Sequence, residues 1–345
     1  MVRIGINGLG VMGRYLIRAI EIERQSGKFF DQEHDGVKYN RQVEVVAFND
    51  LFPASQIVPY LKHDSVYGPF TGSVELDGDD IIINGARMLG SSEKDPAKLN
   101  WKDKGVDVVY DATGVFASKP GVENHLEAGA KKVIISAPSD FAQKTFVMGV
   151  NDDTYKGEDI VSNASCTTNC LAPLARALYD SFGFSNGLMT TIHAYTADQN
   201  LVDGPHKSVA RGYSAALNWV PTTTGAAKAI GKVIDELDKR LNGICIRGPI
   251  PVGSLVDLVV LLDKDADKDA VNDALRGHAN GDLSGVLEYE NGPIVSSMVL
   301  RNPVPCIFDA SQTIVNGPLV KTMAYYDNVS GYSHQAVKMI KMIMK

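Results

Sequence analysis

Cys166 is the residue whose context points most directly to chemistry. It follows the polar run Ser162-Asn-Ala-Ser165 and opens a helical pattern, so we expect it at or near the N-terminus of a helix. Unpaired amides and the positive end of the helix dipole favour the thiolate there, which is the nucleophilic form of cysteine. Cys170, one turn later, is interpreted as a buried small residue. No metal is predicted, because no second cysteine pair with ligand spacing follows.

His193 is the candidate base for this nucleophile, and it ends an apolar strand predicted for residues 187–193. A lone histidine at a strand end is more often structural than catalytic. A reactive cysteine in the same domain favours the catalytic role, because imidazoles commonly activate cysteine nucleophiles. Arg247, within the apolar run 243–247, leaves two interpretations open: a snorkelling or ion-paired arginine, or a fork that binds a substrate phosphate.

A second kind of chemistry is indicated by the glycine motif Gly8-x-Gly10-x-x-Gly13, which lies between a predicted strand and a predicted helix. In such a turn the first glycine permits the sharp bend and the second lets the backbone approach a pyrophosphate. The third allows close packing of helix and strand. The motif therefore predicts a dinucleotide site, and the alternative is a glycine-rich turn with no ligand.

Asp50 ends the next predicted strand, residues 43–48, and its carboxylate could accept hydrogen bonds from the ribose hydroxyls of an adenosine. It lies farther from the last glycine than the usual ~20 residues. The aperiodic polar stretch 24–42 is interpreted as a surface insertion that accounts for the difference.

The elements that must position these residues fall into two groups. Strands predicted at 2–7, 43–48, 106–110 and 132–136 alternate with helical patterns such as 14–23 and 120–130, which is typical of a parallel sheet. After a helix over 171–182, long strands at 187–193, 243–247 and 255–262 have few helices between them, and the chain ends in a helical pattern, 333–345. The sequence predicts an α/β chain: a doubly wound parallel-sheet domain and an α+β domain with a mostly antiparallel sheet.

Composition and charge exclude several classes of protein. The chain has 345 residues, with 34 basic and 41 acidic side chains and a net charge of −7. Since no basic stripe occurs, neither nucleic acid nor an anionic membrane is predicted as a partner. The apolar run 258–262 is far too short to span a membrane, and the N-terminus lacks the pattern of a secretory signal. The expected location is therefore the cytoplasm, where four scattered cysteines stay reduced.

These features occur together in the phosphorylating, type I glyceraldehyde-3-phosphate dehydrogenase family, which the chain resembles over essentially its whole length. The matching segments are 6–10, 49–50, 112–116, 133–138, 146–151, 162–170, 222–228, 326–328 and 331–332. The resemblance implies a Rossmann NAD-binding domain over residues 1–165 and 329–345, and a catalytic domain over residues 166–328.

The activity that the resemblance implies is the oxidation of D-glyceraldehyde 3-phosphate to 1,3-bisphosphoglycerate with NAD, a step of glycolysis and gluconeogenesis. Cys166 would attack the aldehyde and His193 would take the hydroxyl proton. The resulting hemithioacetal would lose a hydride, and inorganic phosphate would displace the thioester. The alternatives are a dehydrogenase for another phosphorylated aldehyde such as erythrose 4-phosphate, or a dinucleotide-binding protein without turnover. A secondary role as a peroxide-sensitive switch would follow from a reactive Cys166.

The resemblance also assigns binding positions. The attacking phosphate would be held by Ser165, Thr167, Thr224 and Gly225. The substrate phosphate would be held by Thr196, Asp198 and Arg247. Cofactor contacts would come from Gly8, Gly10, Val11, Met12, Gly13, Asp50, Thr113, Gly114, Ser136, Asn328 and Tyr332. Asp50, Leu51 and Pro205 match the pattern for NAD rather than NADP, and the expected assembly is a homotetramer with residues 206–218 at a subunit contact.

Some positions depart from the family pattern. The family usually has arginine at the position of Val11, a basic run where residues 209–213 keep only Arg211, and a Thr-Pro-Asn type segment at 250–252. Val329 and Ser330 replace an acidic and an aromatic residue. The chain is therefore identified as a somewhat divergent member that keeps the cysteine and the histidine.

Overall fold

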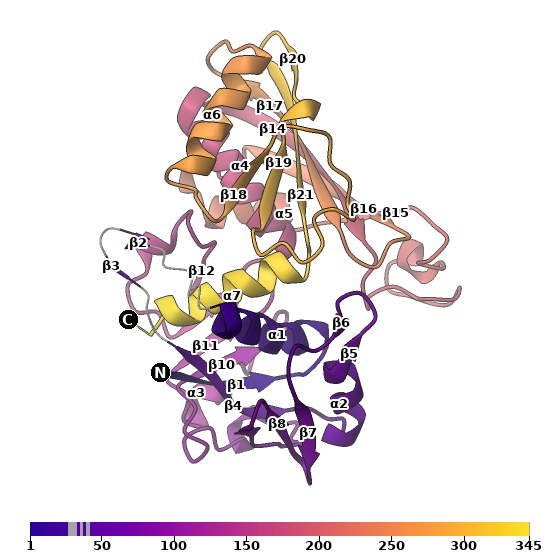
Figure 1. Cartoon of the computed structure of the whole chain (residues 1–345). Coiled ribbons are helices and arrows are strands. Elements are labelled where there is room, and N and C mark those ends of the chain that lie inside the picture. Colours follow the sequence, from indigo (N-terminus) through magenta and orange to yellow (C-terminus); the bar gives the residue numbers. More distant parts are fainter. Residues whose placement is uncertain (27–32, 35–36, 39–41, 345) are drawn as a thin grey trace. The chain divides into compact units, whose positions relative to one another are not determined.

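The computed structural model describes residues 1–26, 33–34, 37–38 and 42–344, which form two compact units (Figure 1). The first unit comprises residues 1–146, 152–164 and 333–345, and the second comprises residues 147–151 and 165–332. The division into an NAD-binding and a catalytic domain, with the bounds given above, stays a prediction. Among the described residues no helix is both long enough and apolar enough to cross a membrane.

The first unit is built on a six-stranded sheet whose neighbouring strands are all parallel. Its order is β12-β13-β11-β10-β1-β4. The strands are β1 (Val2–Asn7), β4 (Val43–Asn49), β10 (Val108–Asp111), β11 (Lys132–Ile135), β12 (Lys144–Thr145) and β13 (Ile160–Ser162). The apolar runs predicted as strands are therefore confirmed, because a sheet that is covered on both faces selects continuous rather than alternating apolar residues.

The sheet order places the chain's first strand between β4 and β10, so successive crossovers leave β1 in opposite directions. Ligands of open parallel sheets bind at the carboxyl ends of the strands at such a switch point. The glycine motif follows β1 directly and Asp50 follows β4. The topology thus brings the predicted cofactor residues to one end of the sheet.

The helices of the first unit are α1 (Val11–Ser26), α2 (Ala54–Lys62), α3 (Asn124–Glu127) and the part of α7 (Ser330–Met342) from Ser333 onward. The helical pattern over 120–130 gives only the short α3. Gly121 and Gly129 both have left-handed φ values, of 108° and 98°, and so the helix cannot extend through either. Most of the insertion predicted over residues 24–42 lies outside the described residues. Of its two ends, residues 24–26 belong to α1, and β4 begins directly after residue 42.

Smaller strand pairs complete the first unit. They are β2 (Glu33–His34) with β3 (Val37–Lys38), β5 (His63–Asp64) with β6 (Gly68–Pro69), and the three-stranded β7 (Val74–Asp77), β8 (Asp80–Ile83) and β9 (Ala86–Met88).

The second unit contains an eight-stranded sheet of order β15-β16-β14-β17-β21-β19-β18, with β20 beside β21. Its pairings are antiparallel except for β14 with β16 and β18 with β19, which confirms the mostly antiparallel prediction. The strands are β14 (Phe184–Ala194), β15 (Val220–Thr223), β16 (Leu241–Gly248), β17 (Ser254–Leu262), β18 (Leu287–Glu290), β19 (Cys306–Asp309), β20 (Ile314–Asn316) and β21 (Leu319–Tyr326).

Helix α4 (Cys166–Phe182) packs against this sheet and against α6 (Lys268–Asn280), and α5 (Ala226–Ala229) follows β15 (Figure 1). Short 3₁₀ helices lie at Pro96–Lys98, Asp152–Thr154, Val209–Gly212, Ile230–Lys232, Asp235–Leu237 and Ala310–Gln312. Side chains alternate along β17, where Val256, Leu258 and Val260 are buried. One face of the sheet is therefore the core face. Side chains also alternate between the two faces along β14 and β16, so residues two positions apart on either strand point to the same face.

A buried ion pair joins α7 to α1 within the first unit. Lys341 donates a hydrogen bond to Glu23, and the side chains are only 3% and 4% exposed. A buried charge that loses its partner is strongly destabilising, because neither water nor an opposite charge then solvates it.

We predict that Lys341→Met lowers the free energy of unfolding by about 3 kcal/mol, since Glu23 keeps its buried carboxylate. Chemical denaturation of the full chain measures the loss. The double variant Lys341→Met with Glu23→Gln removes both charges and is expected to recover most of the stability. Equal losses in the single and double variants would contradict the explanation.

Candidate active site

Cys166 begins α4, as predicted, and the residues before it fix its position. Ser165 is the N-cap, and its hydroxyl accepts a hydrogen bond from the Thr168 amide at 3.0 Å. Ala164 is fully buried and has a left-handed φ of 54°, which is uncommon for a residue with a Cβ. Strained backbone of this kind persists only where the surroundings enforce it, and it is often found at functional sites.

His193 lies beside the cysteine, with 3.4 Å between Cys166 Sγ and His193 Nε2. Its Nδ1 lies 2.7 Å from the carbonyl oxygen of Ala194. A carbonyl only accepts, so Nδ1 carries the proton and donates it. Nε2 therefore presents its lone pair to the sulfur, which is the orientation of a base that takes a proton from Cys166.

Tyr326 holds the two elements together, although sequence analysis gave it no role. Its hydroxyl lies 2.8 Å from Thr167 Oγ1 on α4 and 2.9 Å from Thr191 Oγ1 on β14. The tyrosine is 1% exposed, and its ring packs edge-on against His193. The motif Tyr326-Asp-Asn328 marked this segment, but only the fold shows that the hydroxyl reaches both threonines.

Burial governs the ionisation of the pair. It raises the pKa of the Cys166 thiol to about 11, although Arg247 acts in the opposite direction. Burial, and then the charge of Arg247, lower the pKa of His193 to about 4. These directions favour a neutral thiol beside a neutral imidazole at pH 7, rather than the thiolate expected from the helix N-terminus. Because Cys166 is only half-buried, solvent and the α4 amides reduce the rise.

Arg247 lies next to His193, since the two residues are register partners in the parallel strands β16 and β14. Its Nη1 donates to Thr196 Oγ1 at 2.7 Å, and thus two of the predicted substrate-phosphate residues are in contact. Asp198 does not pair with Arg247. Its carboxylate forms an ion pair with Arg211 instead and lies 3.7 Å from His206 Nε2, and its side chain is 56% exposed.

The residues predicted for the attacking phosphate lie on two helix starts. Ser165 and Thr167 belong to the start of α4, while Thr224 and Gly225 precede α5. Thr224 Oγ1 accepts a hydrogen bond from the Ala226 amide at 3.1 Å. The Thr167 hydroxyl lies 2.8 Å from that of Tyr326, and Thr167 also acts on the Cys166 sulfur through its hydroxyl and its amide.

A cleft of about 710 Å³ opens at the switch point of the parallel sheet. Gly8, Gly10, Asp50 and Thr113 line it, as predicted. Leu51, which matches the NAD pattern, lines it too. Sequence analysis did not identify the other lining residues as cofactor contacts: Asn7, Leu9, Arg14, Asn49, Phe52, Gln56, Ile57, Tyr60, Glu93, Lys94, Ala112, Val115 and Phe116. Their only signal is position, because most lie within a few residues of a strand end or of the Asp50 loop.

The glycine motif has the geometry that a pyrophosphate cradle needs. A Cβ on Gly13 would lie 2.1 Å from the Gly8 carbonyl oxygen, so only glycine lets α1 approach the turn. Gly8 has a φ of 93°, and the space where a Cβ of Gly10 would lie is open. The residues therefore fit a dinucleotide whose phosphates rest on the start of α1. Val11 and Met12 form the first turn of α1.

The Asp50 carboxylate holds the glycine turn in place and can still accept further hydrogen bonds. One carboxylate oxygen accepts the Leu9 amide at 2.7 Å, and the other accepts the Phe52 amide at 2.9 Å. Each oxygen has a second lone pair for a ribose hydroxyl.

Asp111, at the end of β10, organises the opposite wall of the cleft. Its carboxylate accepts hydrogen bonds from Asn7 and from both the amide and the hydroxyl of Thr113. Since Trp101 donates to His125 Nδ1, the ring proton is on Nε2, which donates to Asp111 at 3.2 Å. This buried carboxylate is surrounded by donors that hold Thr113 in place.

The remaining predicted cofactor residues do not line this cleft. Gly114 follows Thr113 with a φ of 71°, and Ser136 follows β11 with its hydroxyl 2.7 Å from that of Tyr110. Asn328 and Tyr332 belong to the second unit, where the Asn328 side-chain oxygen accepts hydrogen bonds from Gly253 and Ser254.

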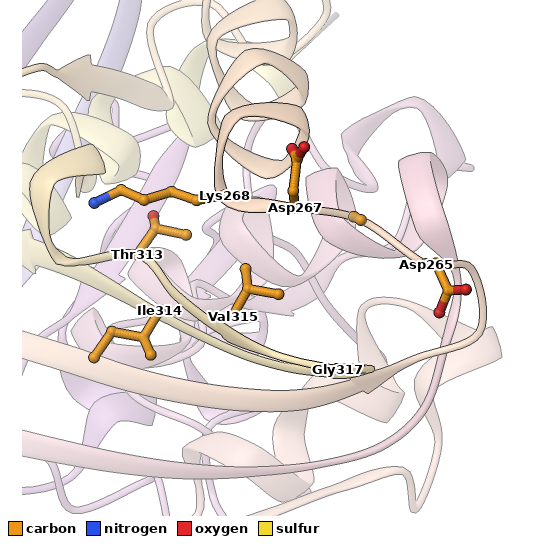
Figure 2. A pocket seen from close by; sticks show the side chains of 8 residues that line it. Asp265, Asp267, Lys268, Thr313, Ile314, Val315 and Gly317 are labelled. Atoms are coloured by element: carbon orange, nitrogen blue, oxygen red, sulfur yellow. The ribbon is translucent and has the colours of Figure 1, made fainter.

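A separate hollow in the second unit lies between the start of α6 and the strand β20. Figure 2 shows Asp265, Asp267 and Lys268 on one side and Thr313, Ile314, Val315 and Gly317 on the other. None of the predicted site residues lines it. The candidate active site is therefore the Cys166–His193 pair, with the glycine cleft as its candidate cofactor site.

Comparisons with known proteins identify the family of the chain. Residues 2–119 match a family model described as "Glyceraldehyde 3-phosphate dehydrogenase, NAD binding domain", and residues 165–328 match the model of the C-terminal domain. The chain is 46% identical to a glyceraldehyde-3-phosphate dehydrogenase of Mycolicibacterium smegmatis and 48% identical to that of Mycobacterium tuberculosis. In both cases all of this chain and 99% of the relative are covered.

Similarity extends to a second bacterial group. Glyceraldehyde-3-phosphate dehydrogenase 1 of Bacillus subtilis is 45% identical, with 100% of this chain and 98% of the relative covered. The relatives match the whole chain, and the two family models match residues 2–119 and 165–328. The chain belongs to the glyceraldehyde-3-phosphate dehydrogenase family.

Proposed function

We propose that the chain oxidises D-glyceraldehyde 3-phosphate to 1,3-bisphosphoglycerate with NAD and inorganic phosphate, a step of glycolysis and gluconeogenesis. The observation that carries the proposal is the 3.4 Å contact between Cys166 Sγ and His193 Nε2, with Arg247 beside the histidine. A nucleophile, a base and a phosphate-binding cation within one unit suit a phosphorylated aldehyde.

The first step is attack of Cys166 Sγ on the aldehyde carbon. The thiol proton passes to His193 Nε2, whose lone pair faces the sulfur, and the imidazolium then donates to the developing oxyanion. A hemithioacetal results. Thr191 and Thr167, held by Tyr326, keep α4 and β14 at the spacing that this transfer needs.

In the second step His193 Nε2 takes the hydroxyl proton of the hemithioacetal while the carbon loses a hydride. NAD supplies the acceptor for that hydride when it is bound. The thioester that remains on Cys166 is then attacked by inorganic phosphate, which forms the acyl phosphate and returns the thiolate.

Two anion sites are proposed. Arg247 and Thr196 bind the phosphate of the aldehyde, because the guanidinium is already oriented by the threonine hydroxyl. Asp198 does not bind the phosphate directly. It forms an ion pair with Arg211 and so orients that arginine at the edge of the site. The attacking phosphate is held by Ser165, Thr167, Thr224 and Gly225.

The proposed NAD contacts are the glycine turn with Val11 and Met12 for the pyrophosphate, and Asp50 for the adenosine ribose. Thr113, Gly114 and Ser136 line the approach to the nicotinamide, and Asn328 with Tyr332 bind its carboxamide end. A carboxylate at Asp50 repels a 2′-phosphate, which favours NAD over NADP.

Erythrose 4-phosphate oxidation, the alternative considered from sequence, is not favoured, because the relatives named above carry the glyceraldehyde-3-phosphate dehydrogenase name. A binding protein without turnover is also not favoured, since Cys166, His193 and Arg247 are all in place. A peroxide-sensitive role for Cys166 stays a prediction.

We also propose a homotetramer in the cytoplasm, a compartment that suits four free cysteines. Two exposed apolar regions of the second unit support the assembly. One is the outer face of the sheet, where Leu188 and Ile244 are 68% and 50% exposed. The other is the 201–219 segment, whose exposed apolar side chains are Leu201, Val202, Val209, Tyr213, Leu217 and Trp219. Large apolar patches of this kind mark protein interfaces.

The activity is tested by measuring NADH formation with NAD and glyceraldehyde 3-phosphate, with and without inorganic phosphate. We expect sustained turnover only with phosphate. Cys166→Ser should lower kcat at least about 10³-fold, because the nucleophile is lost. His193→Asn should lower it about 10²- to 10⁴-fold, because proton transfer is lost. Cys170→Ala, a buried cysteine away from the imidazole, is the matched control and should stay active.

Turnover that does not depend on phosphate would contradict the proposal, and so would a Cys166→Ser variant as active as the wild type. Erythrose 4-phosphate is assayed in parallel, and a higher kcat/KM for it would support the alternative.

The assembly is tested by sedimentation velocity. The paired substitution Leu188→Lys and Ile244→Lys places two charges on the outer sheet face and should dissociate the tetramer into smaller species. Leu76→Lys, at a comparably exposed apolar position of β7, is the control and should leave the tetramer intact. A monomeric wild type would overturn the proposal.

The ionisation of the pair is tested with iodoacetamide, which reacts with the Cys166 thiolate. Burial raises the pKa of Cys166 and Arg247 opposes that rise, so Arg247→Gln should shift the pH profile of alkylation to higher pH. Arg176→Gln, which removes an arginine from the exposed side of α4, should leave the profile unchanged. An unchanged or downward shift in Arg247→Gln would show that the guanidinium does not act on the thiol.

A further inference from the structure

Cys245 is a buried thiol next to the active site to which neither sequence analysis nor the proposed mechanism gives a role. It lies on β16, two residues before Arg247, and the two side chains therefore point to the same face of the sheet. Its neighbours across the sheet are Thr191 on β14 and Thr222 on β15. The residue is 2% exposed, so its sulfur has few available partners.

The sulfur contacts the guanidinium of Arg247. Arg247 Nε lies 3.2 Å from Cys245 Sγ, and an N–H in this position donates to sulfur. Burial raises the pKa of Cys245, although Arg247 acts in the opposite direction. The thiol is thus mostly protonated near pH 7, and it serves as a neutral acceptor rather than as a second nucleophile.

The guanidinium is consequently held at two points of its plane. Nε is fixed by Cys245 and Nη1 by Thr196, and among the described residues Nη2 has no hydrogen-bond partner. With the Nε side occupied, the edge formed by Nη1 and Nη2 is the one that remains for a bidentate contact with an anion. Without the sulfur, rotation about the side-chain torsions would move that edge.

We propose that Cys245 is a positioning residue, whose sulfur orients Arg247 so that its outer edge faces the phosphate group of the aldehyde substrate. This inference rests on the proposed function, because it takes Arg247 as the binding site of the substrate phosphate. It predicts an effect on recognition of phosphorylated aldehydes and none on the chemistry at Cys166.

The test compares glyceraldehyde 3-phosphate with unphosphorylated glyceraldehyde as substrates of the full-length enzyme. Cys245→Ala and Cys245→Val both remove the acceptor, and Val retains side-chain volume. We expect both to raise KM for glyceraldehyde 3-phosphate about tenfold, the usual cost of losing one hydrogen bond to a charged group, with kcat nearly unchanged. The kcat/KM for glyceraldehyde should stay at the wild-type value.

Cys245→Ser keeps an acceptor at this position and should recover most of the lost preference. Cys306→Ala, a buried cysteine of β19 that does not contact Arg247, is the matched control and should behave as the wild type. Arg247→Leu should abolish the preference for the phosphorylated aldehyde.

The outcomes separate the inference from the proposed function. If Arg247→Leu abolishes the preference while Cys245→Ala and Cys245→Val keep it, the positioning role is wrong and the phosphate site stands. If the Cys245 variants lose activity equally with both aldehydes, the residue is merely structural, and the inference is overturned. If Arg247→Leu keeps the preference, the proposed phosphate site is itself wrong, and the role of Cys245 fails with it.

Discussion

The hydroxyl of Tyr326 is the contact on which the active site depends, because it joins the start of α4 to the end of β14. A buried tyrosine hydroxyl needs hydrogen-bond partners, and here both are threonines one or two residues from the reacting groups. Thr167 follows Cys166 directly, and Thr191 precedes His193 by two positions on the same face of the strand. The 3.4 Å contact between sulfur and imidazole is therefore set by packing within the second unit.

Asp111 joins separate segments of the first unit as Tyr326 does in the second, but it does so with a carboxylate instead of a neutral hydroxyl. A carboxylate that is 1% exposed is stable only when donors surround it, and Asn7, Thr113 and His125 provide them. These donors come from the end of β1, the loop after β10 and α3. One buried charge thereby fixes three segments around the switch point, where the cofactor cleft opens.

The sequence allowed prediction of what depends on local pattern, and the fold was needed for contacts between distant segments. The strands, the glycine turn and the helix at Cys166 follow from apolar runs and glycine spacing, so they were predictable. The short α3 was not, because the left-handed backbone at Gly121 and Gly129 is invisible in a helical pattern. Likewise the pairing of Asp198 with Arg211 and the bridging by Tyr326 join residues 13 or more positions apart. No periodicity encodes them.

Arg247 links substrate recognition to proton transfer, since burial lowers the pKa of His193 and the guanidinium that is proposed to bind the phosphate lowers it further. A bound phosphate offsets that positive charge, and so the pKa of the imidazole moves back towards its ordinary value. His193 then becomes a stronger base at the stage when the hemithioacetal hydroxyl must lose its proton. An aldehyde without the phosphate leaves the guanidinium charge uncompensated and the base weak. The charge of Arg247 therefore acts on both recognition and proton transfer, while Thr196 and Cys245 fix the orientation in which it meets the substrate phosphate.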